Sequence, residues 1–157
     1  MLKQALKIGL IIVLALTACD KSGNFPEEPI IKYEGYKIVD GWDSILWQPA
    51  TLCEITISFT DGDGDIGVVV DSTTDNNLLV NYYEIKGGLT DTLDQIDFSS
   101  KIPVLTPAGQ NKSLKGEISL EMNITNRGSD SLIFDLQLLD RSVNASNIVV
   151  TPTIAVE

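Results

Sequence analysis

A two-residue alternation of apolar and polar side chains recurs along the chain and restricts its fold more than any other feature. It is clearest in "CEITISF" at 53–59, "LKGEISLEMNI" at 114–124 and "SLIFDLQLL" at 131–139. Successive side chains of a β-strand point to opposite faces, so this period predicts antiparallel strands that bury one face and expose the other. The apolar faces consist of Cys53, Ile55, Ile57 and Phe59, of Leu114, Ile118, Leu120, Met122 and Ile124, and of Leu132, Phe134, Leu136 and Leu138.

Turn-forming clusters such as "STTDNN", "TPAGQNK" and "TNRGSD" separate the alternating segments, and no helical periodicity is visible after the first residues. We therefore predict an all-β fold, an immunoglobulin-like antiparallel β-sandwich of seven to eight strands. The expected strands cover 30–39, 51–60, 67–70, 78–86, 94–98 (a weak one), 113–124, 131–139 and 147–156. The length of 157 residues suits one domain, which we place at 30–157.

Residues 1–18 are typical of a lipoprotein signal peptide. Lys3 and Lys7 make a short positive region, and "IGLIIVLAL" at 8–16 is apolar. As a helix this stretch rises only about 14 Å, too little to cross a hydrocarbon core of roughly 30 Å. The following "LTAC" resembles the bacterial lipobox, whose cysteine is lipidated and becomes the new N-terminus. We therefore predict acyl chains on Cys19 that hold the protein on a membrane; a secretory signal with a chance cysteine is the alternative.

Residues 19–29 read as a tether between the lipid and the domain, because "DKSGNFPEEP" is polar and contains two prolines. Removal of residues 1–18 and lipidation of Cys19 leave Cys53 as the remaining free cysteine. With no second thiol there can be no intramolecular disulfide. We expect Cys53 to act as a small buried hydrophobic side chain.

Composition excludes several classes of function. The formal net charge is −11, and acidic surfaces repel the phosphates of nucleic acids, so we expect no nucleic-acid partner. Histidine is absent. The chain therefore lacks the usual general base, the usual zinc ligand and any Ser-His-Asp triad.

The segment "FTDGDGDIG" at 59–67 places three aspartates at alternate positions, Asp61, Asp63 and Asp65. Carboxylates this close repel one another unless a cation or protons neutralise them. Calcium prefers oxygen ligands and tolerates irregular geometry, so we predict a structural calcium ion here. The spacing matches only the start of an EF-hand loop, because Ile66 stands where that loop needs glycine and Ser72 where it needs glutamate. The alternative is a solvated acidic turn.

The predicted sandwich supplies further ligands from a second loop. In immunoglobulin-like folds the B–C and F–G loops lie at the same end, and the F–G loop here is "DRSVNASN". We therefore add Asp140 and Asn144 to the predicted metal ligands. The first strand begins at the same end, so Glu27 or Glu28 of the tether could also reach the ion, and calcium would then stiffen the joint between anchor and domain.

Four aromatic residues could form platforms for sugar stacking, namely Trp42, Trp47, Tyr82 and Tyr83. Aromatic side chains more often pack in the core or against a strand edge. We expect packing for all four.

Several segments together resemble a family. They are "FPEEPIIKY" after the lipid cysteine, "ISFTDGDGDIG", "IPVLTPAGQNKSLKGEI" and "LLDRSVNASNIVVTPTI". In order and content they are similar to small lipoproteins of Bacteroidetes-type bacteria that carry an immunoglobulin-like domain. The resemblance implies an envelope location and this fold, and it implies no particular activity.

The function favoured by these features is a non-enzymatic binding or scaffold module, stabilised by calcium and lipid-anchored in the bacterial cell envelope, at the outer rather than the inner membrane. Its partner would be an envelope protein or a surface glycan. The alternative is an accessory subunit of an envelope transport or secretion complex. A glycan-acting enzyme is least favoured, because a loop at a sandwich tip should leave its carboxylates exposed and without a raised pKa.

Overall fold

The computed structural model describes residues 25–44, 46–71, 75–91, 97–105, 112–125 and 128–156. The signal peptide, Cys19 and the first part of the tether lie outside these ranges, so lipidation stays a prediction. Within the described ranges, no helix is long and apolar enough to cross a membrane.

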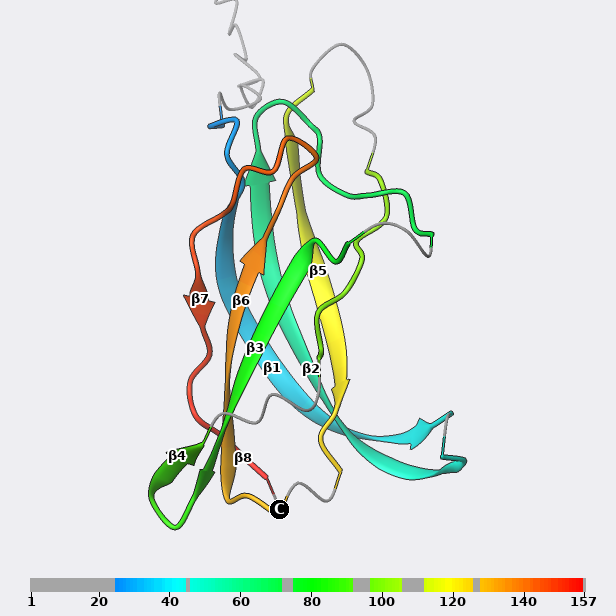
Figure 1. Ribbon diagram of the computed structural model, residues 1–157, viewed down its shortest axis with the longest axis vertical. Helices are drawn as coiled ribbons and strands as arrows, with labels where there is room; N and C mark the ends of the chain where they lie inside the picture. Colours follow the sequence, from blue (N-terminus) through cyan, green and yellow to red (C-terminus); the bar gives the residue numbers. More distant parts are fainter. Residues whose placement is uncertain are drawn as a thin grey trace, which may run out of the picture.

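The described chain forms two antiparallel sheets (Figure 1). Their strands are β1 (Ile30–Asp43), β2 (Gln48–Asp61), β3 (Leu78–Lys86), β4 (Leu89–Asp91), β5 (Leu114–Asn123), β6 (Ser131–Leu138), β7 (Val149–Val150) and β8 (Ile154–Ala155). One sheet has the order β1-β2-β5; the other has the order β4-β3-β6-β7, with β8 also paired to β6. Immunoglobulin-like sandwiches divide their A, B, E and C, F, G strands in this way. The predicted all-β sandwich is confirmed.

The core lies between the sheets and is made by the faces that the alternation predicted. On β2, Cys53, Ile55, Ile57 and Phe59 are buried, and so are Leu132, Phe134, Leu136 and Leu138 of β6. Met122 and Ile124 are also buried, while Leu114, Ile118 and Leu120 pack against the core from β5 and stay half-exposed. Because β5 is the edge of its sheet, its inner face is covered less completely than that of the central strand β2.

Cys53 is a free, fully buried thiol, as expected. Burial raises its pKa to about 11. The side chain therefore stays a neutral thiol at physiological pH, which makes it a poor nucleophile.

The two tyrosines pack as predicted. Tyr82 is buried, and its ring centroid lies 5.2 Å from that of Phe98 and 6.2 Å from that of Phe134. Tyr83 is half-buried on the opposite face of β3, and its hydroxyl donates a hydrogen bond to Asp135 (2.9 Å). Neither residue presents a free aromatic face of the kind that stacks on a sugar.

Three strand predictions were wrong or incomplete. Residues 67–70 form no strand: Gly67 has a φ of 95°, Val68 makes one isolated parallel bridge to Pro103, and Val69 and Val70 are exposed. β-Branched residues favour strands where a partner strand is present, and within the described ranges the segment 102–105 pairs with this stretch only around that single bridge. Of the weak strand at 94–98, Asp97 and Phe98 are not in a strand and the rest is outside the described residues. The final strand is divided into β7 and β8, and the short β4 was missed.

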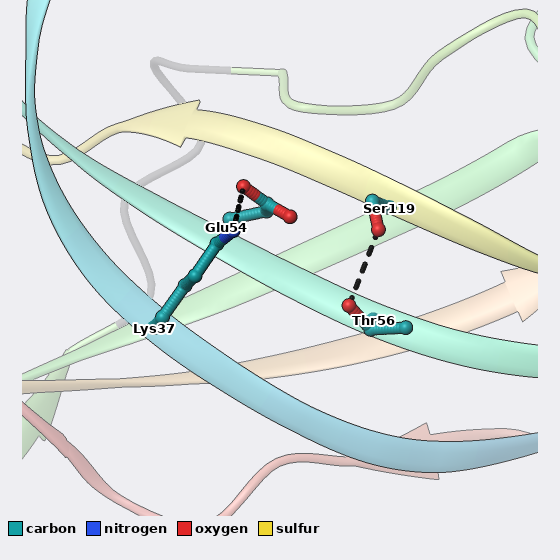
Figure 2. Close-up of polar contacts among 4 residues, drawn as sticks. All are labelled: Lys37, Glu54, Thr56 and Ser119. Atoms are coloured by element: carbon teal, nitrogen blue, oxygen red, sulfur yellow. Dashed lines mark hydrogen bonds and ion pairs between the residues drawn. The ribbon is translucent and has the colours of Figure 1, made fainter.

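The solvent-facing side of the first sheet carries polar cross-strand pairs (Figure 2). The Lys37 ammonium on β1 lies 3.0 Å from the Glu54 carboxylate on β2. Thr56 on β2 and Ser119 on β5 share a hydrogen bond of 3.2 Å between their hydroxyls. These pairs hold the registers Lys37–Glu54 and Thr56–Ser119 that keep the apolar residues on the inner face.

Beyond the end of β5, β1 and β2 continue together as a two-stranded hairpin. β5 pairs with β2 only as far as Leu52, whereas β1 and β2 stay paired as far as Asp43 and Gln48. We call residues 40–44 and 46–51 the hairpin arm. It projects at the end of the molecule opposite to the start of β1 (Figure 1).

The arm presents large apolar side chains to solvent. Trp42 is 54% exposed, Leu46 is 64% exposed and Trp47 is 78% exposed. The expectation that Trp42 and Trp47 pack was therefore wrong. The physical reason is that the arm extends past β5, so a two-stranded ribbon alone cannot cover two indole rings. Trp47 also has a φ of 51°, which is unusual for a bulky residue.

Candidate metal centre

The aspartate loop, residues 61–67, begins at the last residue of β2. Asp61 is fully buried there, and its Oδ2 atom accepts hydrogen bonds from the backbone N–H groups of Gly64 (2.8 Å) and Asp65 (3.1 Å). This closes a tight turn in which Gly64 has a φ of 75°, a conformation that glycine adopts without strain. The glycine is needed because the turn folds the next two aspartates back over the first.

The F–G loop clamps the aspartate loop from the other side. Asp65 Oδ2 accepts hydrogen bonds from the Ser142 hydroxyl (2.8 Å) and backbone N–H (3.2 Å), and the Asp65 carbonyl accepts one from the Arg141 N–H (3.1 Å). The Arg141 guanidinium donates to the carbonyl oxygens of Ile66 (3.2 Å), Gly67 (3.3 Å) and Gly64 (3.5 Å). The prediction that the two loops meet at one end is therefore confirmed.

Together the two loops bring the three aspartates into one cluster. Each contributes one carboxylate oxygen, and these oxygens lie within 4.8 Å of one another. In each of Asp61, Asp63 and Asp65, the Oδ1 atom is buried and has no hydrogen-bond partner. Buried carboxylate oxygens normally have partners, because an unpaired one forfeits its hydration without compensation. A cation bound among the three carboxylates could satisfy such atoms.

Burial and the neighbouring negative charges raise the pKa values of two of the clustered aspartates. The pKa of Asp61 is raised to about 6, mainly by burial and also by the charges of Asp63 and Asp65, against the lowering effect of its two backbone hydrogen bonds. Burial also raises the pKa of Asp63, and the charges of Asp65 and Asp140 raise it further. The expectation that the loop leaves its carboxylates exposed and unshifted was therefore wrong for Asp61.

The donor set fits a hard divalent cation. It consists of carboxylate oxygens, without the nitrogen or sulfur ligands that zinc prefers in proteins. Calcium binds oxygens at about 2.3–2.6 Å, so two ligands on opposite sides of one ion are about 4.6–5.2 Å apart. A group of oxygens within 4.8 Å of one another is compatible with that spacing.

Asp140 and Asn144 lie at the same end, but they pair with each other. Asp140 is buried; its Oδ1 accepts a hydrogen bond from the Asn144 N–H (2.7 Å), and its Oδ2 accepts one from the Asn144 side-chain amide (2.8 Å). Asp140 is still close enough for its charge to raise the pKa of Asp63. The structure thus places both residues beside the cluster, and their direct ligation of a metal stays a prediction.

The N-terminal segment, residues 25–29, reaches the loop with its backbone. A Cβ atom on Gly62 would lie 2.6 Å from the carbonyl oxygen of Pro26 and closer still to that of Phe25. The side chains of Glu27 and Glu28, which the sequence suggested as ligands, are exposed.

Sequence reasoning missed the roles of Arg141 and Ser142. The spacing of the aspartates was visible in the sequence, but the residues that hold them come from a loop about eighty positions away. The one local signal was "DRS" directly after the apolar segment that became β6. In it a guanidinium and a hydroxyl follow Asp140 at the predicted F–G loop.

No protein-family model, curated protein or solved structure matches the chain. The resemblance to small lipoproteins therefore stays a prediction.

Proposed function

We propose that this protein is a lipoprotein of the bacterial cell envelope, anchored through Cys19, whose calcium-stabilised β-sandwich acts as a non-enzymatic binding or scaffold module. Its partner is an envelope protein or a surface glycan, and the outer membrane is favoured over the inner one. Support for the anchor comes from the lipobox-like "LTAC" alone. Support for calcium comes from the aspartate cluster.

One observation carries the proposal of a cation: three clustered carboxylates each have a buried Oδ1 atom without a hydrogen-bond partner. A divalent ion would replace mutual repulsion with attraction and would restore the coordination that burial removes. Glycoside hydrolysis by these residues is less favoured for Asp61, because a sugar could not reach the carboxylate of this fully buried residue.

Thermal unfolding of the full lipoprotein in calcium and in EGTA tests this function. A ligand that binds only the folded state at a hundredfold excess over Kd adds about 2.7 kcal/mol to the free energy of unfolding. For a domain of this size we expect Tm to rise by about 5–10 °C in calcium. Equal Tm values in calcium and EGTA would leave the loop as an acidic turn.

A second candidate function, an accessory subunit of an envelope transport or secretion complex, is favoured by the hairpin arm. Solitary exposed apolar residues are common, but two tryptophans and a leucine together on a projecting hairpin are typical of a protein contact. The arm contains Asp40 and Asp43 and, among its described residues, no lysine or arginine. A partner surface with basic residues around an apolar pocket would complement it.

Site-specific crosslinking in intact cells separates this candidate from the first. A photo-crosslinker in place of Trp47 should give one discrete adduct, and the same group at exposed Thr90 on β4 should give none. Identical adduct patterns from both positions would contradict a specific contact through the arm.

A further inference from the structure

The aspartate loop also contacts the N-terminal segment, residues 25–29. Gly62 lies between two of the three clustered aspartates, and the carbonyl groups of Phe25 and Pro26 occupy the space that any larger residue at position 62 would need. The φ of Gly62 is not in the left-handed region. The glycine is therefore required for close approach of two backbones and not for its conformational freedom.

The segment is held at both of its ends. Phe25 is half-buried and lines a cavity of about 610 Å³ together with Ile30 and Phe59. At the other end Pro29 is buried, and the Asn147 side chain pairs with both the N–H and the C=O of Ile31 (3.0 Å each). Between these two supports, the contact with Gly62 is the one that depends on the shape of the aspartate loop.

The shape of the loop depends on charge. When ionised and without a cation, the three carboxylates repel one another, and Gly62 lies between Asp61 and Asp63, so this repulsion acts on the part of the loop that contacts Phe25 and Pro26. A bound cation offsets this repulsion. Gly62 also contacts the start of β5 in sequence, since its carbonyl accepts a hydrogen bond from the hydroxyl of Ser113, the residue before this strand (3.2 Å).

We infer that cation binding at Asp61, Asp63 and Asp65 docks residues 25–29 onto the aspartate loop and so shortens the connection between the domain and its membrane anchor. The inference rests on the proposed calcium site and on lipidation of Cys19. Fully extended chain sets the upper limits: six residue steps separate Cys19 from Phe25, at most about 22 Å, and eleven separate Cys19 from Ile30, at most about 40 Å. Calcium would thus halve the reach of the domain.

Electron paramagnetic resonance on the full lipoprotein in nanodiscs tests this. A nitroxide on Glu27→Cys reports on the segment, because Glu27 is exposed and the buried Cys53 is shielded from the label. We expect calcium to slow the motion of this label several-fold relative to EGTA. A label on Thr90→Cys at the far end of the other sheet should not change.

Two glycine variants make the test specific. Gly62→Ala keeps all three aspartates, but its Cβ would overlap the carbonyl groups of Phe25 and Pro26 and so prevent docking of residues 25–29. Calcium should still bind, with several-fold weaker affinity, and the Glu27→Cys label should stay mobile. Gly35→Ala is the matched control, because a Cβ there meets nothing within 4 Å and calcium should immobilise the label as before.

The outcomes distinguish the two proposals. Absence of calcium binding in a calorimetric titration of the unsubstituted protein would overturn the calcium site and this inference together. Calcium binding without any change in the Glu27→Cys label would overturn the inference alone, and so would full immobilisation in Gly62→Ala.

Discussion

At the scale of single residues, two of the three aspartates in the loop divide their carboxylate oxygens between different tasks. Asp61 and Asp65 each use Oδ2 to hold the loop, through backbone N–H groups in one case and Ser142 in the other. Their Oδ1 atoms are left for a ligand. The sequence spacing predicted which aspartates cluster. It could not predict this division, which depends on a serine contributed by a distant loop.

Asp63→Asn should separate two effects of the cluster on stability: charge repulsion without calcium and stabilisation by bound calcium. Without calcium the variant should be more stable than the unsubstituted protein, on the order of 1 kcal/mol, because one of three repelling charges is removed. With calcium it should gain little stability, because a ligand is lost. Chemical denaturation in EGTA and in calcium measures both effects, and Asp91→Asn on exposed β4 is the control. A variant that is less stable in EGTA would contradict the repulsion argument.

The raised pKa of Asp61 predicts an inverted pH dependence for the calcium-free protein. The folded pKa is about 6 and the ordinary value is 3.8, so the folded state binds more protons between these pH values. Its stability should therefore fall as pH rises from about 4 to 6, by up to about 3 kcal/mol. Calcium binds the ionised form, so calcium affinity should change in the opposite direction and decline below pH 6.

Denaturation curves at pH 4.5, 6 and 7.5 in EGTA check the sign of this slope. Asp61→Asn keeps an oxygen that can accept the Gly64 and Asp65 N–H groups, so it should flatten the slope without opening the turn. If Asp61→Asn shows the same change of stability with pH as the unsubstituted protein, another group is responsible for the titration.

At the scale of elements, alternation identified the strands that lie inside a sheet and failed where a strand depends on its neighbours. β2 and β6 are central, and their apolar faces are buried as predicted. The valines at 68–70 have high strand propensity, yet they lie in a loop, where Val68 makes one isolated bridge to Pro103 and Val69 and Val70 are exposed. The short β4, β7 and β8 have too few residues to show any period.

The hairpin arm should contribute to contacts and not to stability. Trp47 is 78% exposed, so Trp47→Ser should change the free energy of unfolding by less than about 0.5 kcal/mol. Phe134 is fully buried between the sheets, so Phe134→Ala should cost about 3–5 kcal/mol. Urea denaturation of both variants makes the comparison. A large loss in Trp47→Ser would show that the indole packs in solution.

At the scale of the whole molecule, the side-chain amide of Asn147 connects the two sheets. Asn147 precedes β7 of the second sheet, and its side chain takes the place of a neighbouring strand for Ile31 on β1 of the first. Asn147→Ala should therefore cost about 1–3 kcal/mol, because two partly buried backbone groups lose their partners. Asn81→Ala on the exposed face of β3 is the control, measured by thermal unfolding. Equal stability of the two variants would mean that water replaces the amide.

β1 runs along the full length of the molecule, with the aspartate loop near its first residue and the arm at its last. The thirteen steps between its 14 residues, at about 3.3 Å each, separate these two places by at most about 43 Å. With the proposed lipid anchor at Cys19, the length of β1 would set the distance between the membrane and a partner bound by Trp42 and Trp47. Inserting or deleting residues in β1 and β2 would reset that distance, in the way that the length of a spacer sets the distance between two surfaces.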